Sequence, residues 1–133
     1  MTTFVDSSAL YALIDESDPA HETALAWIEG ISAGEPEQLR THSYVVTETI
    51  ALTHARLGTA AVRMLIDDVL PACDIRFVDG DLHQRAITAY LAGLGRRVSF
   101  VDRASFELMR AERIDRAFAF DPDFSREGFE TVP

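Results

Sequence analysis

After Met1, the chain begins with TTFVDSSALYALI, residues 2–14, in which a short apolar stretch is followed at once by an acid and then by a helical pattern. Residues 2–5 are expected to form a short buried strand, and residues 7–14 a helix with Ser7 or Ser8 as its N-cap. Asp6 stands at the junction. A carboxylate that follows a strand of an α/β sheet lies at the edge where such proteins bind their ligands. The opening stretch therefore predicts a sheet-centred fold with an acid at the edge of the sheet.

The alternation of short apolar stretches with helical patterns continues along the chain. One helical pattern begins at Pro19, one runs from residue 43 to about 57, and one from residue 102 to about 113. Strands that alternate with helices imply parallel pairing, so we predict one α/β domain over residues 1–133, a three-layer α/β/α sandwich with a central parallel sheet of four or five short strands. Besides residues 2–5, strands are expected at residues 39–42, 74–78, 98–101 and 116–120, with a last short one at 129–132.

Three further acids accompany these apolar stretches. Asp102 closes residues 98–101, Asp121 follows the stretch that ends at Phe120, and Glu48 lies inside an apolar helical pattern. Several carboxylates at one edge of a sheet cannot all stay ionised without a counter-charge. A divalent cation is the usual counter-charge, and hard oxygen ligands favour Mg²⁺ or Mn²⁺. The sequence therefore predicts a metal site built from Asp6, Glu48, Asp102 and Asp121.

Each of these acids also has a simpler interpretation. Asp6 and Asp102 could merely cap the helices that follow them. Glu48 could be a solvated helix residue, and Asp121 a residue of an Asp-Pro turn. Asp123 stands near Asp121, so the sequence leaves open which of the two is the fourth acid.

Composition limits the function further. The net charge of −10 argues against a general nucleic-acid coat protein, which would carry a basic surface. All 12 basic residues are Arg, and residues 96–133 carry 7 of them against 8 acids, whereas residues 1–95 carry 5 against 14. Cys73 is the only cysteine, so no intrachain disulfide is expected, which fits a cytoplasmic location. No apolar run approaches the roughly 20 residues of a membrane span, and the start of the chain lacks the pattern of a signal peptide.

Four motifs in order resemble those of PIN-domain ribonucleases, and in particular of VapC-type toxins from toxin–antitoxin modules. They are FVDSSALYA at residues 4–12, VTET at 46–49, SFVDRASF at 99–106 and FAFDPDF at 118–124. The resemblance spans the whole chain. It implies a Mg²⁺- or Mn²⁺-dependent endoribonuclease that is a homodimer and is inhibited by a small antitoxin protein.

The resemblance also implies roles for individual residues. By position, the metal ligands would be the same four acids that the strand ends suggest. Ser7 matches the hydroxyl residue beside the first acid, where it would support that acid or the substrate. Many relatives have Thr or Ser immediately before the third acid, whereas this chain has Val101 there, with Ser99 as a candidate replacement. The antitoxin is expected to present a basic segment to the acidic groove, because opposite charges steer association.

Three other functions fit parts of this pattern. A stand-alone RNA-processing PIN nuclease would use the same acids without an antitoxin. A catalytically weak PIN-like module would bind metal and act through a partner. A receiver-like signalling domain would also hold Mg²⁺ at strand ends, but it needs a Lys near its phospho-acceptor, and this chain has no Lys.

Overall fold

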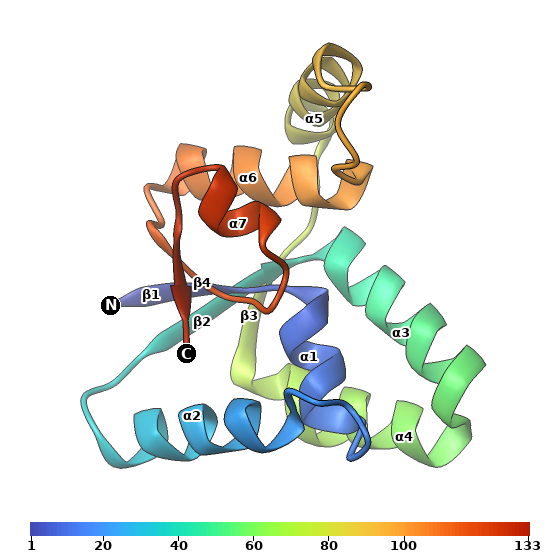
Figure 1. The fold of residues 1–133 in the computed structure, drawn as a ribbon, viewed down its shortest axis with the longest axis vertical. Coiled ribbons are helices and arrows are strands. Elements are labelled where there is room, and N and C mark those ends of the chain that lie inside the picture. Colours follow the sequence, from blue (N-terminus) through green and yellow to red (C-terminus); the bar gives the residue numbers. More distant parts are fainter.

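The computed structural model describes all 133 residues, and five strands form one sheet at their centre (Figure 1). All five run parallel, and their order in the sheet places the first strand in the middle, so the chain winds outward from it in both directions. The strands are β1 (Thr2–Val5), β2 (Gln38–His42), β3 (Cys73–Arg76), β4 (Arg116–Phe118) and β5 (Glu130–Val132), in the order β3-β2-β1-β4-β5.

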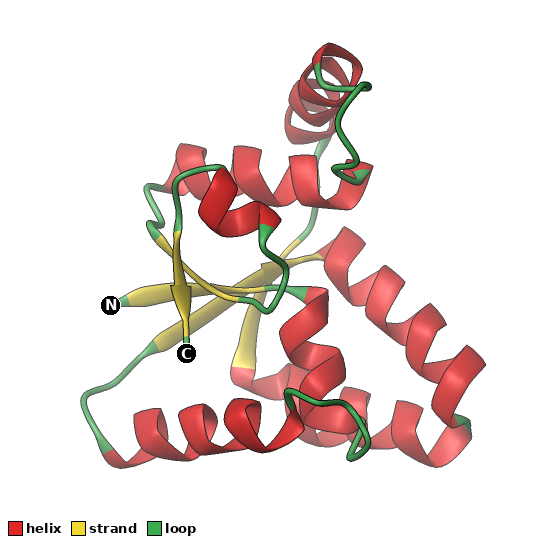
Figure 2. Cartoon of the chain, in the orientation of Figure 1, coloured by secondary structure: helices red, strands yellow, loops and turns green.

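The helices are α1 (Ser7–Ile14), α2 (His21–Ala33), α3 (Ser43–Leu57), α4 (Thr59–Met64), α5 (Gly80–Ala92), α6 (Phe100–Glu112) and α7 (Asp123–Arg126), with a π-helical stretch η1 (Leu65–Val69) and a 3₁₀ turn η2 (Leu70–Ala72) after α4. In Figure 2, α6 and α7 lie on one face of the sheet, and α1, α2 and α4 lie on the other. This confirms the predicted α/β sandwich with a central parallel sheet. None of the helices combines the length and apolar character needed to span a bilayer.

The register of the sheet determines which loops meet. Phe4 pairs with Arg40 on one side and with Ala117 on the other, and Val5 pairs with Phe118. Parallel strands in this register end together, so the residues after β1 and β4 emerge at the same edge of the sheet. The backbone N–H of Asp6 extends the pairing and donates to the carbonyl of Phe118 at 3.0 Å.

The expected strand at residues 98–101 is wrong. Phe100 and Val101 already belong to α6, and Ser99 is the N-cap of that helix, with its Oγ accepting a hydrogen bond from Asp102 N at 3.0 Å. Periodicity alone cannot separate a four-residue apolar run in a strand from one in a helix. The aromatic residue of this run, Phe100, packs against Tyr44 of α3 and Tyr90 of α5.

The cap of one helix and the start of another also differ from the expected ones. Asp6 itself caps α1, in place of Ser7 or Ser8, and α2 begins at His21, after Pro19. His42 caps α3 through Nδ1, which accepts from Tyr44 N at 3.2 Å. Asp6 directly follows β1 and His42 ends β2, so these two strands pass into helices without a loop.

The core lies between the sheet and the helices on its two faces. Phe4, Phe118, Phe106 and Phe124 are all fully buried. The Phe106 and Phe124 rings meet edge to face with their centroids 5.0 Å apart, which fixes α7 against α6. This packing holds the chain after β4 close to the first turn of α6.

Candidate metal centre

Asp6 lies directly after β1 and has an exposed fraction of only 1%. Its Oδ2 accepts hydrogen bonds from Ser8 N at 3.1 Å and from Ser8 Oγ at 2.6 Å, but its Oδ1 has no hydrogen-bond partner. Burial raises the pKa of Asp6 to about 6 against the opposing effect of the Ser8 hydrogen bonds, and the charge of Asp121 adds to the rise. An unpartnered oxygen on a buried carboxylate is costly, so Asp6 Oδ1 requires a positive partner or a proton.

Asp102 lies in the first turn of α6 and is also buried. Burial, together with the charges of Asp6, Asp121 and Glu48, raises the pKa of Asp102 to about 8. A helix N-terminus normally favours the ionised form of an acid, so burial and like charges outweigh that effect here. The other three predicted acids therefore all lie close enough to Asp102 to act on its charge.

Asp121 follows β4 and joins Asp102 in a tight group with a third acid. Asp102, Asp121 and Asp123 each place one carboxylate oxygen within 4.8 Å of the other two. Asp121 Oδ1 also accepts a hydrogen bond from Asp123 N at 2.9 Å, and Asp123 pairs with Arg126 at 3.1 Å. Asp123, which the sequence offered only as an alternative to Asp121, therefore stands beside it.

Glu48 approaches the same place from α3 and is half-buried. It lies near enough to Asp102 to raise the pKa of that residue, but it stands outside the tight group of three. A Glu side chain one turn into a helix reaches farther than an Asp at a strand end. We call Asp6, Glu48, Asp102 and Asp121 together the acidic rim; Asp6 and Glu48 act on Asp102 but lie outside the tight group of three.

Two serines support the acidic rim, and one of them is a residue that sequence reasoning missed. Ser99 caps the turn that carries Asp102. The hydroxyl that contacts Asp6 belongs to Ser8, whereas Ser7 contributes only its backbone to the pKa of Asp6. Ser8 Oγ also accepts from Phe120 N at 3.0 Å and so connects Asp6 to the chain after β4. Its position two residues after a capping Asp was the available signal.

The acidic rim lacks positive charge. None of its four carboxylates makes an ion pair, although ten ion pairs occur elsewhere in the molecule. Carboxylates held together in a buried place remain ionised at neutral pH only with a counter-charge. A hard divalent cation fits the oxygen ligands, and the unpartnered Asp6 Oδ1 is the observation that supports such a fit.

Comparison with known proteins agrees with this geometry. The PIN domain family matches residues 3–130, and the chain belongs to that family. More particularly, it is a homologue of a VapC toxin: it is 35% identical over 130 residues to "23S rRNA-specific endonuclease VapC20" of Mycobacterium tuberculosis, covering 97% of this chain and 96% of that protein.

Solved structures show the same fold. The crystal structure of Mycobacterium tuberculosis VapC20, described as a sarcin-ricin loop cleaving toxin, has a TM-score of 0.85 and 33% identity, with both chains fully covered. Two more distant structures share the fold alone. FitAcB from Neisseria gonorrhoeae has a TM-score of 0.70 at 13% identity, covering 100% of this chain and 97% of that one. VapBC2 from Rickettsia felis, bound to promoter DNA, has a TM-score of 0.73 at 12% identity, covering 98% and 97%.

Proposed function

We propose that this protein is a divalent-metal-dependent endoribonuclease and acts as the toxin of a toxin–antitoxin pair. The observation that carries the proposal is the acidic rim, in which four carboxylates meet without an ion pair in a chain that belongs to the PIN-domain family. The family relation to a 23S rRNA-specific endonuclease supports RNA as the substrate. It also makes the sarcin–ricin loop the first RNA to test.

In this proposal Asp6, Asp102 and Asp121 hold Mg²⁺ or Mn²⁺, with Glu48 on the outer side and Asp123 beside Asp121. The ion would lower the pKa of a water molecule and stabilise negative charge on a phosphate. The carboxylates orient the reacting groups, and the hydrogen bonds from Ser8 keep Asp6 in a single orientation. Ser99 does the same for the turn that carries Asp102. No Ser, Cys or His nucleophile is required.

We propose a small antitoxin protein with a basic segment as the partner. The absence of ion pairs on the acidic rim supports this, since a cationic side chain could supply the missing charge in place of the metal. RNA cleavage by the free protein should then exceed that by the co-purified complex across a Mn²⁺ series. Equal cleavage at every metal concentration would favour a stand-alone processing nuclease. A homodimer and a cytoplasmic location are further proposals that follow from the family.

The nuclease function is tested with the protein purified free of any partner. It should cut an RNA that contains the sarcin–ricin loop in Mn²⁺, and EDTA should stop the reaction. Asp6→Asn should remove most of the activity while the circular dichroism spectrum stays the same, because Asn keeps the shape and loses the charge. Asp68→Asn is the matched control, since Asp68 is exposed and lies on η1, away from the rim. Full cleavage by Asp6→Asn would assign the chemistry to other residues.

A further inference from the structure

We propose that Arg96 and Arg97 form a binding site for an RNA phosphodiester next to the acidic rim. We call these two residues the arginine pair. The inference rests on the proposed ribonuclease function and extends it, because it identifies the side chains that hold the RNA backbone. The site takes a phosphate of the strand that continues past the position of cleavage.

A cleft joins the arginine pair to the acids. Its volume is about 480 Å³, and Arg96 and Arg97 line it together with Asp121 and Asp123. Asp121 and Asp123 also belong to the tight group of acids around Asp102. A strand that places one phosphate at the acids therefore has a continuous path along this cleft to the arginine pair.

The arginine pair is free to bind an anion. No carboxylate lies within ion-pair distance of Arg96 or Arg97, and both side chains are exposed. Apart from Asp121, which belongs to the acidic rim, the other charges of the cleft are already paired, since Arg126 binds Asp123 at 3.1 Å and Glu127 binds Arg110 at 2.8 Å. A guanidinium binds a phosphate through two parallel hydrogen bonds, so two free arginines form a strong phosphate site.

The loop that carries the arginine pair is anchored to the opposite wall of the cleft. Arg96 N donates to the carbonyl of Gly93 at 2.9 Å, and the guanidinium of Arg103 lies against Gly93, where an added Cβ would have to displace it. Arg103 in turn pairs with Glu127 at 3.2 Å, and Glu127 lines the cleft. The base of the loop is therefore fixed relative to the acids, which reduces the entropy lost when RNA binds.

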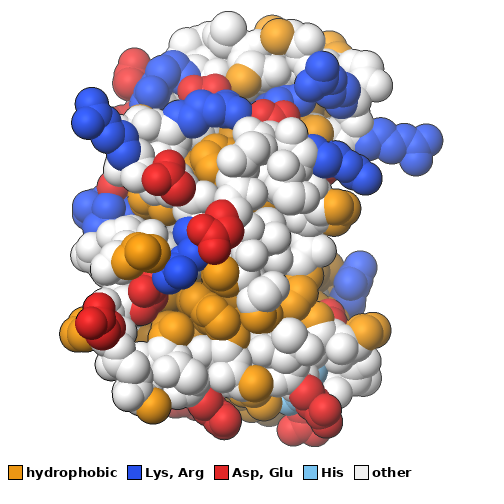
Figure 3. All heavy atoms as spheres, turned by 60° about the vertical axis from the view of Figure 1, so that its left-hand side comes forward, with side chains coloured by type: hydrophobic (Ala, Val, Ile, Leu, Met, Phe, Trp, Pro, Cys, Tyr) orange, Lys and Arg blue, Asp and Glu red, His pale blue; other side chains and the backbone are white.

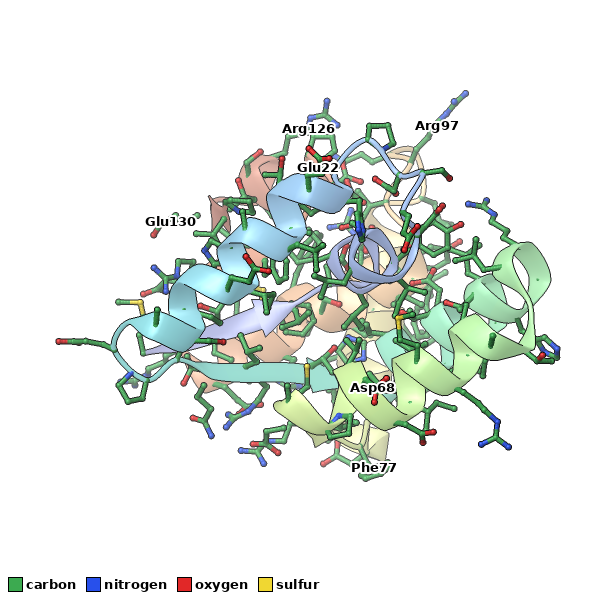
Figure 4. All side chains as sticks on the ribbon, turned by 90° about the horizontal axis from the view of Figure 1, so that it is seen from below. Glu22, Asp68, Phe77, Arg97, Arg126 and Glu130 are labelled. Atoms are coloured by element: carbon green, nitrogen blue, oxygen red, sulfur yellow. The ribbon has the colours of Figure 1, made fainter.

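The two arginines of the cleft that the figures label point outward from one edge of the molecule. Figure 4 shows Arg97 and Arg126 at the same edge, whereas Phe77 lies at the opposite one. In Figure 3 the arginine side chains gather over the upper part of the face that is turned forward. Because the whole chain carries a net charge of −10, RNA is repelled by most of its surface. A local cluster of cations beside the acids would select the productive direction of approach.

The test measures the affinity of a fluorescent sarcin–ricin-loop RNA by anisotropy, in EDTA and across a NaCl series. The test variant is the double substitution Arg96→Ala with Arg97→Ala. The matched control is Arg63→Ala with Arg113→Ala, which removes two other exposed arginines without ion pairs that lie outside the cleft. Both variants change the net charge by the same amount, so the control accounts for long-range electrostatics.

The test variant should bind the RNA roughly tenfold more weakly or worse, because two charge-assisted phosphate contacts are lost. The slope of log affinity against log salt should fall by about 1.4–1.8, the value for two phosphate contacts. The control should stay within about twofold of the unchanged protein. Equal behaviour of the two variants would overturn the inference, and so would an unchanged protein that binds no RNA.

Cleavage in Mn²⁺ is measured separately, so that the two proposals can fail independently. The test variant should need more RNA for half-maximal cleavage while its rate at saturating RNA stays near that of the control. If the unchanged protein binds RNA through the arginine pair but never cuts it, the nuclease function is wrong and the phosphate site stands. If it cuts RNA and the two variants bind equally, the phosphate site is wrong and the nuclease function stands.

Discussion

The two ends of the sheet carry buried charge in opposite ways. Toward the amino-terminal ends of the strands, three half-buried acids have cationic partners. Arg40 lies between Asp74, at 2.9 Å, and Glu112, and Arg116 pairs with Glu37 at 2.7 Å. At the carboxyl-terminal ends the acidic rim has no arginine at all. The charges at the first end are balanced within the chain, whereas the acids at the second end need a counter-charge from outside it.

The pKa values express the same difference. Burial tends to raise the pKa of both Glu37 and Asp102. Hydrogen bonds from Thr3 and Arg116 and the charge of Arg116 outweigh burial at Glu37, so its pKa lies below the usual value. At Asp102 the neighbouring charges are acids, and the pKa rises to about 8. A carboxylate on this sheet therefore has a structural role where the fold places an arginine beside it, and can bind a ligand where the fold does not.

The largest expected effect compares one acid from each end. Asp102→Asn should reduce RNA cleavage by at least about 10³-fold, because a metal ligand at the reaction centre is lost. Asp74→Asn should leave cleavage within about threefold, since Asp74 serves only the Arg40 cluster. Initial rates in Mn²⁺, measured below the melting temperatures of both variants, check this. Similar losses in the two variants would remove the distinction between the ends.

The next comparison lies within the tight group of acids. Asp121→Asn should reduce cleavage by roughly 10²-fold, and Asp123→Asn by less than about tenfold. Asp123 already has Arg126 as a partner, whereas Asp121 makes no ion pair and raises the pKa of Asp6 and Asp102. The ratio of the two cleavage rates is the measurement. A reversed order would make Asp123 the fourth ligand.

At the amino-terminal ends of the strands, removing the cationic side chain of Arg40 should destabilise the fold. Arg40→Met should lower the free energy of unfolding by about 2–3 kcal/mol, because Asp74 and Glu112 lose the more buried of the two arginines that they share and keep only the more exposed Arg76. Urea unfolding measures the change. Arg63→Met, at an exposed position without an ion pair, is the control and should stay within about 0.5 kcal/mol.

At the acidic rim, removing a charge should instead stabilise the metal-free fold. The pKa of Asp102 is raised from 3.8 to about 8 in the folded state, so ionisation destabilises the metal-free fold increasingly between these two pH values. Asp102→Asn should therefore be more stable than the unchanged protein in EDTA, by roughly 1–3 kcal/mol near pH 8. The gain should disappear below pH 3.8, where the acid is protonated in both states. A loss of stability near pH 8 would contradict the pKa.

Much of this arrangement could be predicted from the sequence. An acid directly after an apolar strand of a parallel sheet lies at the carboxyl edge of the sheet, which accounts for Asp6. The strand expected at residues 116–120 ends at Phe118, so Asp121 follows it after two further residues. Asp102 was expected near them at the end of a strand, but α6 brings it there instead. A short, largely apolar run does not distinguish the two geometries, because its periodicity fits a strand and a helix equally well.

The rest depends on contacts that no local pattern records. Ser8 Oγ accepts a hydrogen bond from Phe120 N, which lies 112 residues away in the sequence. The role of Ser8 beside Asp6 is therefore visible only when β1 and β4 are paired. The arginine pair follows Gly95 in a loop with no periodic pattern, and only the packing of α6 and α7 places it across a cleft from Asp121. Long-range juxtaposition of this kind is a property of the topology, not of spacing in the sequence.

The most direct measurement of the central claim is a set of thermal melts with and without millimolar Mn²⁺ at a pH near 8, for the unchanged protein, Asp102→Asn and Asp74→Asn. If the acidic rim lacks a charge that a divalent ion supplies, Mn²⁺ should raise the melting temperature of the unchanged protein and of Asp74→Asn by about 3–8 °C. The same Mn²⁺ should leave Asp102→Asn almost unmoved. If Mn²⁺ does not raise the melting temperature of the unchanged protein, or raises the melting temperatures of all three proteins equally, the account is contradicted.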